Sequence, residues 1–91
     1  MITTAIRHSV TDYAKWKSVY DTFRPTTEGG AKFARVNRSV EDPNQVTVVA
    51  GFDTLELAKA FVDNPNLKAK MTEAGVVGSP RIEINEEVES I

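Results

Sequence analysis

The chain contains no cysteine, one histidine, one tryptophan and two tyrosines. The lack of cysteine excludes disulfide bonds, thiolate metal sites and cysteine nucleophiles. With one histidine and scattered carboxylates, no spacing typical of metal ligands exists, so we expect no metal site and no resident cofactor. Only His8 titrates near neutral pH without special help from its surroundings.

Long apolar runs and clusters of one charge are also missing. The formal net charge is -2 and the basic residues are scattered, which argues against nucleic-acid binding. No apolar stretch is long enough for a membrane span and the N-terminus has no signal pattern, so we expect a cytoplasmic protein that does not enter the membrane. The length of 91 residues predicts a single domain, residues 1–91, small enough to gain stability from a second copy.

What the chain does have is a clear succession of hydrophobic periodicities. Period-two alternation indicates strands and spacings of three and four indicate helices. The order is β-α-β-β-α-β, which predicts an α+β, ferredoxin-like fold with a four-stranded antiparallel sheet and its helices on one face. The expected segments are Ile2–Val10, Asp12–Glu28, Ala31–Val40, Gln45–Phe52, Thr54–Ala74 and Arg81–Val88.

Local signals refine the helical segments. Thr11 or Asp12 can cap the first helix, and Pro25 should end it near Phe23 or Arg24.

The second helical segment carries two start signals. Asp53 with Glu56 has the spacing of a capping box, and Asn64-Pro65 has the pattern of a second helix start. We therefore expect a short helix over Pro65–Ala74, followed by a loop over Gly75–Pro80 that leads into the last strand.

The first helix carries aromatic residues at steps of three and four: Tyr13, Trp16, Tyr20 and Phe23. Such a stripe is typical of a helix face that docks on a core. It can equally wall a pocket for a flat ligand, with the Tyr20 hydroxyl available for a hydrogen bond.

His8 lies on the same strand face as Val10, which precedes the helix cap and should fold back onto the first turn. This placement predicts that His8 lies under the aromatic stripe. There it is either a general base or a donor to a substrate carbonyl, or a structural histidine bonded to backbone, Tyr13 or Tyr20.

On the third segment, Phe33, Arg35 and Asn37 share one strand face. Their polar groups could bind a substrate oxygen. On an outer strand, however, such groups more often reach solvent or bridge a dimer interface.

Three stretches resemble the small dimeric α+β barrel proteins related to antibiotic biosynthesis monooxygenases. They are the H-x-V-x-D-Y-x-x-W pattern from His8 to Trp16, the hairpin from Arg38 to Val46, and the stretch from Ala74 to Pro80. The resemblance implies a homodimer whose two sheets meet to close a barrel, with a pocket between the helices and the sheet of each subunit. Physics favours the pairing too, because Val36, Val49 and their neighbours would otherwise be wetted.

Members of this group include cofactor-free monooxygenases of polyketide phenols, cyclases, haem-degrading enzymes and small dismutases. The asparagine, tryptophan and arginine of the cofactor-free monooxygenases have no residue-by-residue match here. The haem-degrading members use a helical histidine, whereas His8 lies on a strand. The resemblance therefore carries over the fold and the pocket position, and no catalytic residue.

Two functional hypotheses follow. The first is a cofactor-independent monooxygenase or cyclase acting on a small aromatic or polyketide-like molecule, with His8 as the catalytic base. The second is a non-catalytic small-molecule-binding or stress-associated dimer. The substrate-binding residues expected for the first are Trp16, Tyr20, Phe61 and Met71.

Overall fold

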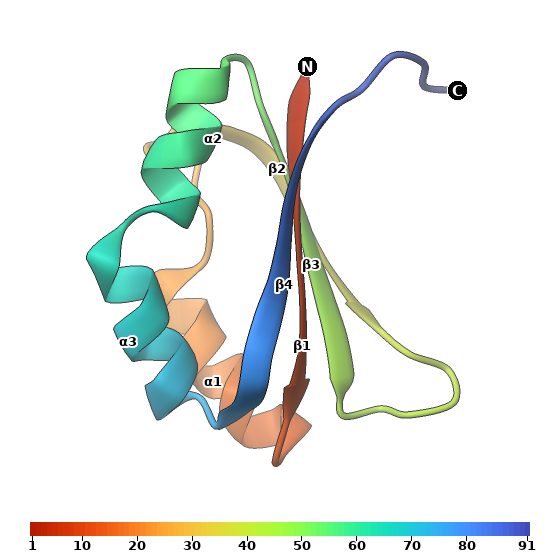
Figure 1. The fold of residues 1–91 in the computed structure, drawn as a ribbon, viewed down its shortest axis with the longest axis vertical. Helices are drawn as coiled ribbons and strands as arrows, with labels where there is room; N and C mark the ends of the chain where they lie inside the picture. Colours follow the sequence, from red (N-terminus) through yellow and green to blue (C-terminus); the bar gives the residue numbers. More distant parts are fainter.

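The computed structural model describes residues 1–91 as a sheet with helices on one side (Figure 1). It confirms the α+β class and the β-α-β-β-α-β order, with the second helical segment divided in two at Asn64. The elements are β1 (Ile2–Val10), α1 (Tyr13–Phe23), β2 (Ala31–Arg38), β3 (Gln45–Phe52), α2 (Leu55–Val62), α3 (Pro65–Glu73) and β4 (Val76–Glu86).

The four strands form one antiparallel sheet in the order β2-β3-β1-β4. The central strands are therefore β1 and β3, as the ferredoxin-like prediction requires. Between them, Ile6 pairs with Val48 and His8 with Val46. These side chains point to the same face, which α1, α2 and α3 cover (Figure 1).

The helix-covered face of the sheet holds the core. Its β1 and β3 side chains are almost inaccessible to solvent, and two groups of packed apolar residues form above them. One group surrounds Trp16 of α1. The other surrounds Phe52 of β3 and Ala58 of α2. The buried residues of the two strands on this face are Thr4, Ile6, His8, Val10, Val46, Val48, Ala50 and Phe52.

The expectation that Val36 and Val49 share the uncovered face is wrong for Val36. Val36 pairs with Val48 and packs against the core around Trp16. Val49 pairs with Arg35, and these two side chains lie on the uncovered face, which we call the open face. The difference follows from the two-residue alternation of strands, because Val36 and Arg35 are neighbours in sequence and must point to opposite sides.

Two of the expected helix boundaries are confirmed and one is shifted. Asp12 caps α1, its carboxylate accepting from the Ala14 amide at 2.9 Å, and α1 ends at Phe23. Residues 24–28 of the first helical segment are therefore not helical. For α2, Thr54 is the cap instead of Asp53, since its hydroxyl accepts from the Leu57 amide at 3.2 Å.

The Asp53 carboxylate has a different partner. It lies 3.0 Å from the Lys32 ammonium of β2. Asp53 and Thr54 are both good capping residues; the threonine caps the helix, and the aspartate side chain instead faces Lys32 of the sheet.

The last strand begins earlier than expected. β4 starts at Val76 instead of Arg81 and ends at Glu86, so the predicted loop over Gly75–Pro80 is largely strand. Pro80 has no paired residue on β1, so its missing amide hydrogen costs no hydrogen bond of the ladder. The pairing shifts here, from Arg7–Arg81 to Ser9–Val77, and Gly78 takes a positive φ of 72°. Gly78, Ser79 and Pro80 thus bulge opposite His8.

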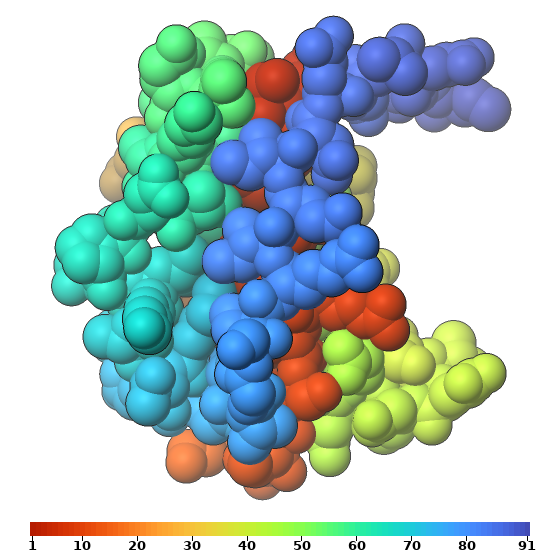
Figure 2. Space-filling view, in the orientation of Figure 1, coloured from red at the N-terminus to blue at the C-terminus, as the bar shows by residue number.

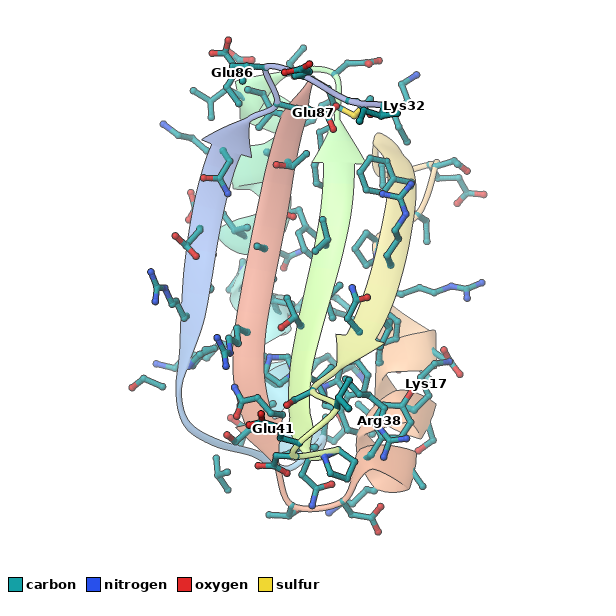
Figure 3. The ribbon with its side chains drawn as sticks, turned by 90° about the vertical axis from the view of Figure 1, so that its right-hand side faces the viewer. Lys17, Lys32, Arg38, Glu41, Glu86 and Glu87 are labelled. Atoms are coloured by element: carbon teal, nitrogen blue, oxygen red, sulfur yellow. The ribbon has the colours of Figure 1, made fainter.

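The open face is bounded by two projecting segments. The turn between β2 and β3 leaves the sheet at one end and the C-terminal residues leave it at the other, so the surface is hollowed between them (Figures 1 and 2). Figure 3 looks onto this face, with Glu41 at the turn and Glu86 and Glu87 at the opposite end. No helix of the structure is both long and apolar enough to pass through a bilayer.

Candidate functional site

The site is built where α1 crosses the covered face of the sheet. Capping by Asp12 begins the helix, and the spacing of three and four residues turns its aromatic stripe down onto β1. Trp16 is the buried centre of this stripe. Its ring lies 5.5 Å from the His8 ring and stacks on Tyr20 at 4.8 Å with an interplanar angle of 17°.

A narrow cavity remains beneath the helices, which we call the inner cavity. Its volume is about 40 Å³ and most of its lining is apolar. The lining residues are Ile6, His8, Trp16, Val19, Tyr20, Phe23, Val48, Phe61, Leu67, Lys70, Met71 and Ala74.

All five residues that the sequence suggested for a site line this one cavity. His8 comes from β1, Trp16 and Tyr20 from α1, Phe61 from α2 and Met71 from α3. The structure brings them together, and their functional roles remain proposals.

Sequence reasoning missed Lys70. It lies three residues after Leu67 and four before Ala74, so the helical spacing of α3 places it on the cavity side. In the sequence it counts only as one of the scattered basic residues. Its ammonium lies 3.2 Å from the Glu73 carboxylate on the same helix.

His8 is the chemically conspicuous group of the inner cavity. Only 5% of the residue is exposed, and neither ring nitrogen has a hydrogen-bond partner in the protein. The expected alternative, a structural histidine that forms a hydrogen bond to Tyr13, Tyr20 or the backbone, is therefore not observed. A buried polar group without a partner costs about 1–3 kcal/mol, so such groups are rare and need an explanation.

Burial also determines the charge of His8. The apolar surroundings lower its pKa below the ordinary value of 6.5, because they disfavour the charged imidazolium. The imidazole is therefore neutral at pH 7, with one nitrogen able to donate a hydrogen bond and the other able to accept one. A ligand hydroxyl or carbonyl would satisfy either nitrogen.

Tyr20 is a further polar group at the cavity, beside His8 and Lys70. Burial raises the pKa of its hydroxyl, while nearby Arg24 lowers it and Asp21 raises it. The phenol is thus protonated at neutral pH. It is half-buried, and its hydroxyl takes part in none of the side-chain hydrogen bonds of the structure.

The size of the inner cavity limits what it holds in this conformation. About 40 Å³ suits a water-sized molecule, whereas ligand sites commonly measure roughly 300–1,000 Å³. An aromatic ligand therefore requires side chains of the lining to move. The structure contains no group of three or more histidine, aspartate and glutamate side chains arranged to hold a metal ion.

A second hollow lies on the opposite side of the sheet. It measures about 520 Å³ and is mostly polar, with Arg7 and Arg81 facing each other across β1 and β4. Turn residues Glu41 and Asp42 border it. Phe33, Arg35 and Asn37 occupy another part of the open face, where the Arg35 guanidinium lies 4.1 Å from the centre of the Phe33 ring.

Comparison with known proteins agrees with the fold. No protein-family profile matches the sequence, and no curated protein matches it. Among solved structures, the chain is similar to a protein of Bordetella bronchiseptica assigned as an antibiotic biosynthesis monooxygenase, with a TM-score of 0.77, 17% identity and 97% of each chain covered. A Caulobacter crescentus protein of the same assignment gives a TM-score of 0.77 at 18% identity, covering 97% of this chain and 90% of its own.

A third similar structure is SnoaB of Streptomyces nogalater, a cofactor-independent oxygenase. Its TM-score is 0.76 at 13% identity, with 99% of this chain and 95% of SnoaB covered. Identities this low establish shared architecture and leave function open. The chain therefore has the fold of the antibiotic biosynthesis monooxygenase-like proteins, as the resemblance in its sequence suggested.

Proposed function

We propose that the inner cavity binds a small aromatic, polyketide-like molecule and that the protein is a cofactor-independent monooxygenase. The observation that carries this proposal is His8: a neutral, buried imidazole with both nitrogens unpartnered, next to the rings of Trp16 and Tyr20. Such a group is suited to accept a proton or to hold a ligand hydroxyl. The likeness to SnoaB supports oxygenation over other proton-transfer reactions.

The reaction we propose needs a base and molecular oxygen. An anthrone is a suitable model substrate, because its central methylene carbon becomes an electron-rich carbanion once a base removes a proton. In the overall step one O₂ is consumed, one oxygen atom becomes the new ring carbonyl, and the other leaves as water with the two methylene hydrogens. His8 takes the first proton and returns it, since the apolar cavity disfavours a lasting imidazolium.

The other residues of the cavity position the substrate and keep water away from it. Trp16 and Tyr20 hold the ring of the substrate, while Phe61 and Met71 close the far wall. Orientation of bound reactants and exclusion of water are the two effects that an apolar pocket supplies.

The small volume of the cavity favours a second candidate function. A pocket of about 40 Å³ leaves little room for a substrate together with O₂, which fits a non-catalytic dimer that binds a small molecule without turning it over. In that case His8 would bond to the ligand and no oxygen would be consumed.

We also propose that the protein is a homodimer whose two open faces meet to close a barrel. Val49 and Ala5 on the open face are half-buried in one subunit, and Val77 is 48% exposed. The projecting turn and C-terminal residues frame a concave surface on the same side (Figure 2). A second sheet would remove these apolar groups from water.

Oxygen uptake with 1,8-dihydroxyanthrone tests the catalytic proposal. We expect protein-dependent oxygen consumption with formation of the quinone, and at least a roughly 100-fold loss in the His8→Gln variant, the usual scale for a general base. Ligand binding by calorimetry separates the two candidates. Binding of the anthrone without oxygen uptake would support the non-catalytic dimer, and His8→Gln with full activity would overturn the role of the imidazole.

A further inference from the structure

Tyr20 separates the inner cavity from a larger hollow outside it. This outer hollow measures about 490 Å³ and lies between the end of α1, the residues that follow it, and β2. Tyr20 is the single residue that lines both spaces. The outer hollow is lined by Lys17, Tyr20, Arg24, Pro25, Thr26, Thr27, Ala34 and Val36.

The Tyr20 side chain is able to move. It is half-buried and its hydroxyl has no hydrogen-bond partner. It packs against the core group around Trp16 and stacks on the Trp16 ring at 4.8 Å, and an entering aromatic ring can replace this stacking. Rotation of Tyr20 would join the outer hollow to the inner cavity and supply the volume that an aromatic ligand needs.

The outer hollow carries positive charge and no carboxylate among its lining residues. Lys17 lies one helical turn before Tyr20 on α1, and Arg24 is the residue that follows the helix; both line the outer hollow beside Tyr20. The Lys17 ammonium lies 5.9 Å from the centre of the Tyr20 ring. Figure 3 shows Lys17 on α1 beside the outer edge of β2.

The two cations differ in what they already bind. Lys17 forms an ion pair of 2.6 Å with Asp21, while Arg24 forms none. Hydroxyl groups add further donors, since Thr26 only accepts a hydrogen bond, from the Gly29 amide at 3.3 Å. A guanidinium without an ion-pair partner can bind a carboxylate through two parallel hydrogen bonds.

We propose that the ligand is an aromatic carboxylic acid, with its ring in the inner cavity against His8 and its carboxylate in the outer hollow on Arg24 and Lys17. This inference rests on the proposed ligand-binding role of the inner cavity and adds the chemical class of the ligand. Tyr20, which holds the ring once it is bound, must first turn aside and so acts as the gate between the two parts. One end of the ligand thus meets a neutral hydrogen-bonding group and the other end meets positive charge.

Lys70 is the competing cation. It lines the inner cavity from α3, on the other side from the outer hollow, and is paired with Glu73. A carboxylate bound by Lys70 would place the ligand in the opposite direction. Separate variants of the two ends therefore determine its orientation.

The test is calorimetric titration with two probes of equal shape, 2-naphthoate and 2-naphthylmethanol, which differ in charge. We expect the acid to bind at least about tenfold more tightly than the alcohol in low salt. Arg24→Gln combined with Lys17→Gln should remove this difference and leave the affinity for the alcohol unchanged. The matched control is Lys15→Gln with Lys59→Gln, two exposed lysines outside both spaces.

The outcomes distinguish this inference from the proposed function. Equal affinity for acid and alcohol in the unmodified protein overturns the acid site alone. Loss of the preference in Lys70→Gln, with the double variant unaffected, overturns the orientation. Binding of neither probe, also in a Tyr20→Ala variant with the gate removed, overturns both the acid site and the pocket.

Discussion

The two faces of the sheet are made by the same strands and differ in how far their side chains are exposed to solvent. On β1 and β3, most residues that face the helices are almost completely buried, while their sequence neighbours on the open face, except Gly51, remain at least partly accessible. Val48 is 4% exposed within the core, and Val49 next to it lies on the open face opposite Arg35.

The difference shows how a small domain divides its hydrophobic surface. The covered face buries the apolar side chains that form the core of one chain. It also contains the inner cavity, with the unpartnered His8. The open face mixes valine and alanine with arginine and threonine. This composition is too polar for a core and typical of an interface between subunits.

The largest difference between the two faces should appear when a charge is placed on each face in turn. Val48→Asp should unfold the protein, because it buries a carboxylate without a partner and removes core packing. Val49→Asp should leave the fold intact and convert the proposed dimer into monomers, with dimer affinity at least about 100-fold weaker. Circular dichroism and sedimentation velocity of both variants measure these effects.

The result for the unmodified protein decides how the Val49 variant is read. A monomer at micromolar concentration would contradict the assembly we propose. A dimer that survives Val49→Asp would place the interface elsewhere on the molecule.

A smaller effect concerns Gly51 of β3, whose lack of a side chain leaves space for the Phe33 ring on the open face. A Cβ atom at this position would collide with the Phe33 ring and come within 2.8 Å of the Met1 sulfur. Gly51→Ala should therefore lower the free energy of unfolding by about 1–3 kcal/mol. In a Phe33→Ala background the same change should cost clearly less, and a double-mutant cycle in urea gives the coupling.

The pH dependence of stability tests the burial of His8. Its folded pKa lies below the unfolded value, so between pH 6.5 and the folded pKa the unfolded chain binds more protons. Stability is then complete above pH 6.5 and falls as the pH decreases, by at most about 1.4 kcal/mol per pH unit. The His8→Gln variant should lack this decline between pH 6.5 and 5, and an identical decline in both proteins would assign it to other groups.

The smallest effect concerns the start of α2 on the covered side. Thr54→Ala should lower the free energy of unfolding by about 0.5–2 kcal/mol, because it removes the cap on the Leu57 amide. Asp53→Ala breaks only the exposed pair with Lys32, which is worth about 0–1 kcal/mol. The reverse order of the two effects would restore Asp53 as the cap.

The covered face could be predicted from the sequence better than the edges. The alternation of β1 and the helical spacing of α1 predict that His8, Trp16 and Tyr20 lie close together between the helix and the sheet. All three line the inner cavity. Strong periodicity determines which side of an element is buried, whereas the position of the pocket was implied by the resemblance to the dimeric α+β barrel proteins.

Other features depend on contacts between distant parts of the chain. Pro80 and two glycines suggested a loop, yet pairing with β1 makes that segment the start of β4. Asp53 and Thr54 are equivalent as caps in sequence, and the distant Lys32 separates them. The volume of the inner cavity follows from three helices packing together, which no local pattern describes.

Whether His8 is neutral and binds the ligand can be read from the ¹⁵N NMR spectrum of its imidazole, because it is the only histidine in the chain. The spectrum should be recorded between pH 5 and 8, with and without an aromatic ligand. The account predicts a neutral imidazole at pH 7, with titration below pH 6.5 and a clear shift of one ring nitrogen when 2-naphthylmethanol is added. An imidazole that titrates at pH 6.5 or above and ignores the ligand would contradict it.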